Sequence, residues 1–377
     1  MEAAEDREHR HAPPGGAPGG GDGGPQDERR PRRPRPDPQG PAGDAEPDDF
    51  HPERGRLVLP RGDRRSEDRP GTDPPPQEGR GFGDRRVPAE QGDPVRPSSS
   101  RRIALARLLE EGRGAELAPD PVAFPHRYSD PRDAEAAAFL AATFAFGAVL
   151  QIRNFLSRLF DALPPSPHAA LTGAEPVRRR SVAGLSHRFI SSDGVYRFLR
   201  CVRGAYLAHG SLERLYIAGR GEAPPDLRRD LARFLDGFRD RWGKSLSRER
   251  DFLFPRPERG SACKRHNLFL RWVVRGPDGV DLGLWSAVSP RDLIVPLDTH
   301  MARLGGWLGL TRRKTPDWRM AEEITASLRA ACPEDPVKFD YPLTRLGILR
   351  ICTRPRRGVC GHCPVASLCS LRSSAAG

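Results

Sequence analysis

The chain has 377 residues and a formal net charge of +12. Residues 1–100 hold 19 of the 40 prolines and 16 of the 39 glycines and show almost no apolar periodicity, so we expect a disordered tail there. Residues 101–377 carry a net charge of +16, which favours a polyanionic partner such as nucleic acid. No apolar run approaches the length of a transmembrane helix, so we expect no membrane span.

Helical periodicity begins at residue 101, where the run RIALARLLEEG gathers its apolar residues on one face. The strongest helical signal covers 133–163, with Gly147 marking a break between two helices. No run shows sustained period-two alternation, so the fold class is all-α, with either one large core or two lobes on either side of a loop near 250–259. Further helices are expected over 194–208, 211–217, 225–242, 264–274, 299–309, 317–331 and 338–351.

A glycine-containing turn, in the run ERGSACKRHN, leads directly into the helix expected at 264–274. Backbone N–H groups at a helix N-terminus can bind a DNA phosphate, although an ordinary interhelical turn has the same sequence character. Only four of the 62 basic residues are lysines, and one of them, Lys264, lies in this first helical turn. Unlike arginine, lysine can lose its proton in a desolvated cleft and form a Schiff base. Lys264 is therefore a candidate nucleophile, with a solvated lysine as the simpler alternative.

Asp298 follows an apolar segment, in the run LIVPLDTHMARLGGWLGL, and stands at the start of the next helix. The simplest role for a carboxylate at this position is to cap the helix N-terminus. The same geometry would hold the carboxylate rigidly at a cleft, where it can stabilise positive charge on a reacting sugar or activate a nucleophile. The two roles are compatible.

Four of the seven cysteines form a C-x7-C-x2-C-x5-C array: Cys352, Cys360, Cys363 and Cys369. Disulfides are disfavoured, because the number of cysteines is odd, the other three are scattered singly, and the pattern fits a reducing cytosol. Zinc sites usually pair two short knuckles, whereas this array has only one. The uneven spacing therefore favours a 4Fe-4S cluster, with structural zinc as the alternative cofactor.

In this order, the turn with Lys264, the DTH segment with Asp298 and the cysteine array resemble the helix-hairpin-helix superfamily of DNA glycosylases, in particular its endonuclease III branch. The resemblance covers residues 133–369, and the chain as a whole also resembles a bacterial family of unknown function. The resemblance to the glycosylases implies a two-lobed helical domain over 101–377 with a cluster loop at 352–369. It further implies that Lys264 and Asp298 are catalytic and that the hairpin binds DNA through Gly260, Ser261, Ala262 and Arg265.

The chain departs from the endonuclease III pattern at several positions. The first cysteine gap is seven residues rather than six. Ala262 replaces the second hairpin glycine, which would strain the hairpin if that position requires a positive φ. The interval between Lys264 and Asp298 is 34 residues, and the additional run GPDGVDLGLWSAVSPRD suggests a loop inserted over the cleft. Trp272 and Trp285 are candidates for stacking on a flipped base, or else plain core residues.

The resemblance implies a base-excision DNA repair glycosylase, with AP-lyase activity, acting on damaged or abasic duplex DNA. Lys264 would attack C1′ of the sugar, with its pKa lowered by burial or by Arg265 and His266. Gln151 is the counterpart of the family's residues that probe the DNA gap. We expect a cytoplasmic, nucleoid-associated monomer. The alternatives are a non-enzymatic DNA-binding protein on the same scaffold and an interaction module that holds zinc.

Overall fold

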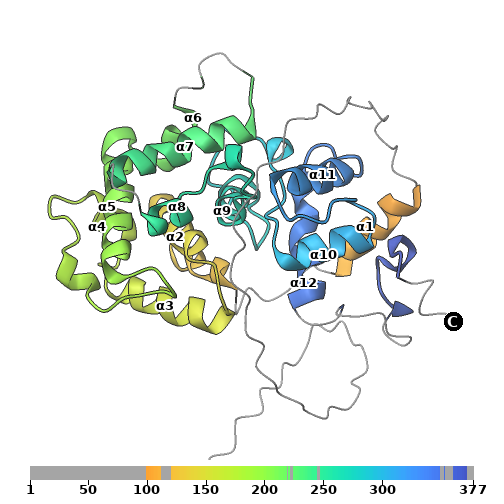
Figure 1. Ribbon diagram of the computed structural model, residues 1–377, viewed down its shortest axis with the longest axis horizontal. Coiled ribbons are helices and arrows are strands. Elements are labelled where there is room, and N and C mark those ends of the chain that lie inside the picture. Colours follow the sequence, from red (N-terminus) through yellow and green to blue (C-terminus); the bar gives the residue numbers. More distant parts are fainter. Residues whose placement is uncertain are drawn as a thin grey trace, which may run out of the picture. The chain divides into compact units, whose positions relative to one another are not determined.

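The computed structural model describes residues 99–111, 120–218, 220, 224–243, 247–348, 352 and 360–371. The expected disordered tail before residue 99 and most of the loop between the first two cysteines of the array lie outside these residues. The described residues fold into α-helices and short 3-10 turns and contain no β-strand, which confirms the all-α class (Figure 1). None of their helices is long and apolar enough to cross a membrane.

The helices follow the expected order closely. The break at Gly147, whose φ is +103°, separates α2 from α3 as predicted. Two short helices, α4 and α8, were not expected, because each is a single short run without periodicity of its own. The α-helices are α1 (Ser99–Glu111), α2 (Pro131–Thr143), α3 (Val149–Asp161), α4 (Pro167–Thr172), α5 (Ser192–His209), α6 (Leu212–Ile217), α7 (Leu227–Trp242), α8 (Arg248–Leu253), α9 (Lys264–Val274), α10 (Thr299–Trp307), α11 (Trp318–Arg329) and α12 (Asp340–Ile348).

The apolar residues form one continuous core rather than two separate ones. Helix α2, which is buried almost all round, packs against α9, while α5 packs against α7 and α10 against α12. Helix α1 lies beside α12 and the C-terminal turn η7 (Ala366–Leu368), which Cys369 follows; both are distant from α1 in sequence (Figure 1). Helix α9 therefore connects the helices from α2 to α8 with the rest of the core.

The segment near 250–259 is not the simple loop that the sequence predicted. It contains α8 and the 3-10 turn η4 (Pro257–Arg259). Leu253, the last residue of α8, and Phe254, which follows it, are both fully buried. Ser247 caps α8 by accepting a hydrogen bond from the Arg250 backbone N–H. This segment is thus part of the packed structure and fixes the position of the turn that follows it.

The insertion between Lys264 and Asp298 forms a loop, as expected, and packs into the core at Trp285 and Val288. Its expected place over a cleft stays a prediction. Trp285 is buried, and its Nε1–H donates to Glu135 Oε1 at 2.7 Å. The backbone N–H of Trp285 donates to the carbonyl oxygen of Val273 at the end of α9. Trp272 is buried as well, so both tryptophans are core residues rather than stacking surfaces.

Candidate functional site

The turn before α9 has two residues in the left-handed region, Gly260 at φ +88° and Cys263 at φ +45°. Ala262 has no positive φ, so the strain expected there falls one residue later, on Cys263. Two hydrogen bonds hold the turn: Asn267 Nδ2 donates to the Ala262 carbonyl at 2.9 Å, and the Trp318 backbone N–H donates to the Gly260 carbonyl at 3.0 Å. Cys263 provides no side-chain cap for α9, which leaves the helix N-terminus available to an anion.

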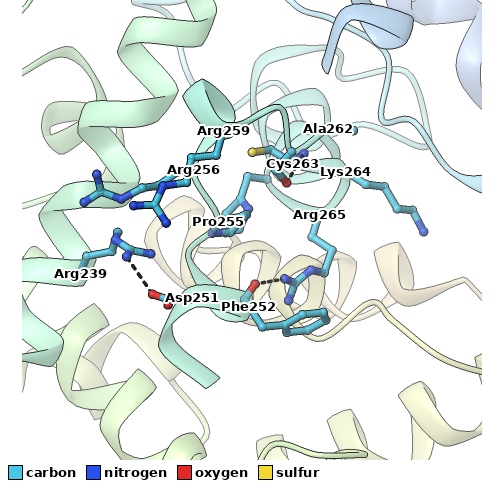
Figure 2. A pocket seen from close by; sticks show the side chains of 12 residues that line it. Arg239, Asp251, Phe252, Pro255, Arg256, Arg259, Ala262, Cys263, Lys264 and Arg265 are labelled. Carbon is cyan, nitrogen blue, oxygen red and sulfur yellow. Dashed lines mark hydrogen bonds and ion pairs between the residues drawn. The ribbon is translucent and has the colours of Figure 1, made fainter. Parts of the chain in front are cut away.

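Lys264 is the first residue of α9, and its side chain is half-buried. Figure 2 shows this side chain extending away from Arg239 and Arg256. Within the described part of the chain, the Lys264 side chain makes no hydrogen bond or ion pair. Burial raises the pKa of Asp120, and the charge of Lys264 is among those that oppose this rise. Asp120 caps the 3-10 turn η1 (Pro121–Ala123) by accepting a hydrogen bond from the Val122 backbone N–H at 3.0 Å.

Asp298 caps α10, which confirms the structural role predicted for it. Its Oδ1 accepts a hydrogen bond from the Met301 backbone N–H at 2.7 Å. The side chain is half-buried, and its negative charge helps to raise the pKa of Asp340, a buried residue at the start of α12. The carboxylate of Asp298 is therefore near enough to the more deeply buried carboxylate of Asp340 for their charges to interact.

A buried ion network joins α9 to the start of α12 and to the insertion that follows α9. Arg271 of α9 donates to Asp340 Oδ2 at 2.7 Å and to Asp281 Oδ2 at 3.2 Å. Burial raises the pKa of Asp340 to about 6, although Arg271 acts against this. Burial also raises the pKa of Asp120, and the positive charges of Arg271, Arg345 and Lys264 oppose it.

The only direct contact among the described residues Lys264, Asp120, Arg271, Asp340 and Asp298 is the ion pair of Arg271 with Asp340. Lys264 acts on Asp120, and Asp298 on Asp340, through charge alone. The residues that the structure describes give no direct hydrogen bond or ion pair between Lys264 and Asp298. Sequence reasoning missed Asp120, Arg271 and Asp340, because each lies in a run that carries no motif by itself.

Arg265 is buried, with 8% of its surface exposed, where a surface contact with DNA was predicted. Its guanidinium donates to the carbonyl oxygens of Thr143, at 2.7 Å, and Phe252, and lies 4.1 Å from the centroid of the Phe252 ring. Figure 2 shows Arg265 directed toward Phe252 and away from Lys264. A duplex that touches only the surface would not meet this side chain.

His266 is 1% exposed and cannot serve as a charged neighbour of Lys264. Burial and the Arg265 guanidinium lower its pKa well below the usual value, with the Leu253 backbone acting weakly in the opposite direction. The imidazole is therefore neutral near pH 7.

A cavity of about 480 Å³ opens beside the turn, on the side of α7 and α8 (Figure 2). The sequence pointed to the turn in its wall but not to the cavity itself, because arginines such as Arg239 and Arg256 read in the sequence as solvated charges. Its lining is Arg239, Asp251, Phe252, Pro255, Arg256, Arg259, Ser261, Ala262, Cys263, Lys264, Arg265 and His266.

The four cysteines of the array line one small apolar cavity of about 30 Å³, together with Leu304, Trp307, Leu308, Val365 and Ala366. None of the four forms a disulfide. Burial raises the pKa of the Cys352 thiol to about 11, and the other three thiols add to this rise. Nowhere in the described ranges do three or more histidine, cysteine or carboxylate side chains take up an arrangement that could already hold a metal ion. The donor set is nevertheless purely thiol and faces one apolar space, which suits a thiolate-bound metal centre.

Gln151 is exposed in the first turn of α3, close to Gly147 and the turn that precedes that helix. Its predicted role as a probe of the DNA gap stays a prediction.

Comparison with curated proteins and with solved structures found no match for this chain. Comparison with protein families found one match, over residues 120–349. This range includes the turn, Lys264, Asp298 and the buried ion network, and ends before the cysteine array. Because the match covers more than half of the chain, the chain belongs to the family described as "Protein of unknown function (DUF2400)".

Proposed function

We propose that this protein is a DNA glycosylase of base-excision repair with AP-lyase activity, acting on a damaged base in duplex DNA. The observation that carries the proposal is that Lys264 begins α9 and Asp298 caps α10, while Arg271, also on α9, pairs with Asp340, whose pKa the charge of Asp298 helps to raise. The net charge of +16 on residues 101–377 and the uncapped start of α9 agree with binding to a phosphate backbone.

In the proposed reaction, the Lys264 amine attacks C1′ of the damaged nucleotide. The bond between C1′ and the base breaks, and the base leaves with the bonding electrons and takes up a proton. Asp298, held by its cap to Met301, stabilises the positive charge that develops on the sugar. The Lys264 nitrogen loses its proton, the C1′–O4′ bond of the sugar breaks, and O4′ takes up a proton as the imine forms. Loss of a proton from C2′ then permits β-elimination of the 3′ phosphate and cleavage of the strand.

The experiment is borohydride trapping on a panel of duplexes that carry different damaged bases or an abasic site. We expect a covalent complex with at least one duplex, lost in Lys264→Gln and retained in Lys314→Gln, a matched change of an exposed lysine. The lyase mechanism is wrong if no duplex is trapped, or if Lys264→Gln is trapped as well as the unchanged protein.

A second candidate is a non-enzymatic DNA-binding protein. It is favoured by the lack, among the described residues, of a direct contact between Lys264 and Asp298. It predicts salt-dependent binding to duplex or abasic DNA without any product. Single-turnover assays on the same panel distinguish the two candidates.

We propose further that Cys352, Cys360, Cys363 and Cys369 hold a 4Fe-4S cluster, which would tie the C-terminal turn η7 to α10 and α1. Anaerobically purified protein should then absorb near 400 nm and contain iron. Cys360→Ser should lose iron, whereas Cys332→Ser, at a cysteine outside this cavity, should keep it. Stoichiometric zinc without iron would instead support the zinc-containing interaction module.

A further inference from the structure

The cavity beside the turn contains a buried positive charge for which the described residues supply no carboxylate. Arg265 donates only to carbonyl oxygens, those of Thr143 and Phe252. Buried charges in proteins are normally paired, because an unpaired charge loses the solvation it has in water. The loss of water here is large enough to lower the pKa of Arg265 to about 9. An anion that entered the cavity would offset this cost.

Other polar atoms around the cavity also lack partners within the described ranges. Neither ring nitrogen of His266 makes a hydrogen bond of normal geometry, although this residue is 1% exposed. The Nε of Arg256 is buried and unpaired in the same way. Buried polar groups are nearly always hydrogen-bonded, and these atoms, buried within the walls, make the surroundings of the cavity polar without reaching its space.

The charges around the cavity are strongly unbalanced. Asp251 is the single carboxylate in the lining, and it already pairs with Arg239 at 2.8 Å. Arg256 pairs at 3.0 Å with Asp236, which lies outside the lining. Arg259 is exposed, and its side chain makes no hydrogen bond or ion pair with any described residue. The Arg259 guanidinium therefore remains for an anion, and Arg265, which Figure 2 shows directed toward Phe252, adds positive charge in the wall of the cavity.

We infer that this cavity binds a phosphate monoester of nucleotide size. Guanidinium groups bind phosphate oxygens in pairs, and a dianion suits the excess of positive charge. A volume of about 480 Å³ exceeds the needs of inorganic phosphate and lies in the range of small-molecule sites, roughly 300–1,000 Å³. A phosphodiester on an intact duplex lies on a convex rod and would not reach groups as buried as Arg265 and His266. A free nucleotide or the phosphorylated end of a strand can enter, and the inference does not depend on the glycosylase proposal.

The test measures binding to the full chain with nucleoside 5′-monophosphates, the matching nucleosides, and single strands that carry a 5′-phosphate or a 5′-hydroxyl. We expect the phosphorylated form of each pair to bind about tenfold tighter or more, because charge-assisted hydrogen bonds are among the strongest. A preference seen only with strands identifies a strand end as the ligand, and competition by the free monophosphate identifies a nucleotide. Equal affinity of the phosphate and hydroxyl forms in both pairs overturns the inference.

Variants assign the preference to the cavity. Arg259→Ala should reduce the phosphate preference about tenfold, and Arg259→Lys should restore part of it. Arg153→Ala, an equally exposed arginine on α3, is the matched control and should keep the full preference. Arg265→Met should abolish the preference, but it also removes two hydrogen bonds of the core, so Arg259→Ala carries the decision. An equal loss in Arg259→Ala and Arg153→Ala would mean that the phosphate binds elsewhere.

Discussion

The two sides of the turn at residues 260–263 differ in charge and in composition. On one side, Arg271 pairs with Asp281 and Asp340, and the charges of Asp120 and Asp298 act on this network. On the other side, the charged residues of the cavity lining are four arginines, Lys264 and a single carboxylate, Asp251, and the Lys264 side chain extends away from Arg239 and Arg256 (Figure 2). The first set can accept protons and stabilise a developing cation, whereas the second can only attract an anion. One short turn thus separates a region suited to chemistry from a region suited to binding.

The largest expected effect is on the Lys264 side of the turn. Asp298→Asn should lower the rate of base release by about 10²–10⁴-fold, because asparagine cannot supply negative charge to the sugar. Asparagine still caps a helix, so the unfolding free energy should hardly change. Single-turnover kinetics on the lesion trapped by borohydride, together with a denaturant titration, provide the measurement. Unchanged kinetics would leave Asp298 with capping as its role.

The second prediction concerns the network that lies between Lys264 and Asp298. Arg271→Met should lower the unfolding free energy by about 3–5 kcal/mol, because it leaves Asp340 and Asp281 buried without this partner. Arg200→Met, a change of an exposed arginine on α5, is the control and should have little effect in urea or guanidinium unfolding. A small effect of Arg271→Met would show that water or Arg275 satisfies the two carboxylates.

A smaller effect is expected in the pH dependence of stability. The folded-state pKa of Asp340, about 6, lies above its usual value of 3.8, so the folded protein holds this proton more tightly than the unfolded chain does. The contribution of Asp340 to the unfolding free energy is therefore fully present below about pH 4 and is lost as the pH rises through 6. Asp340→Asn should flatten unfolding free energy against pH in this window. Asp161→Asn, at an exposed aspartate on α3, should keep the slope of the unchanged protein.

The smallest effect tests whether the insertion between Lys264 and Asp298 contributes to stability alone or also to substrate binding. Trp285→Phe keeps an aromatic ring but removes the hydrogen bond to Glu135, so it should cost about 1–3 kcal/mol of unfolding free energy. Tyr206 and the backbone N–H groups of Leu212 and Glu213 still donate to the Glu135 carboxylate. The substrate KM should not change. A raised KM with unchanged stability would instead favour a loop that closes over substrate.

Local pattern was enough to predict most of the helices and the role of two special positions. Helix α9 begins and ends where its periodicity predicted, the break at Gly147 lies between α2 and α3, and Asp298 caps α10. These features depend on neighbours within a few residues, such as an apolar face, a glycine or a capping carboxylate. The sequence also supplied the four cysteines, whose side chains line one cavity.

Tertiary structure decided the features that depend on residues far apart in the chain. Arg265, which was expected to touch DNA, is buried against Phe252 and Thr143, and only packing could determine this. Asp340 pairs with Arg271 although about 70 residues separate them along the chain, a pairing that no local pattern encodes. Sequence by itself determined most of the helices and the cap at Asp298, because these are set by short-range backbone preferences, and its motifs supplied the candidate reactive residues. The fold decided which charges share a buried space, because burial and pairing arise only when distant segments pack together.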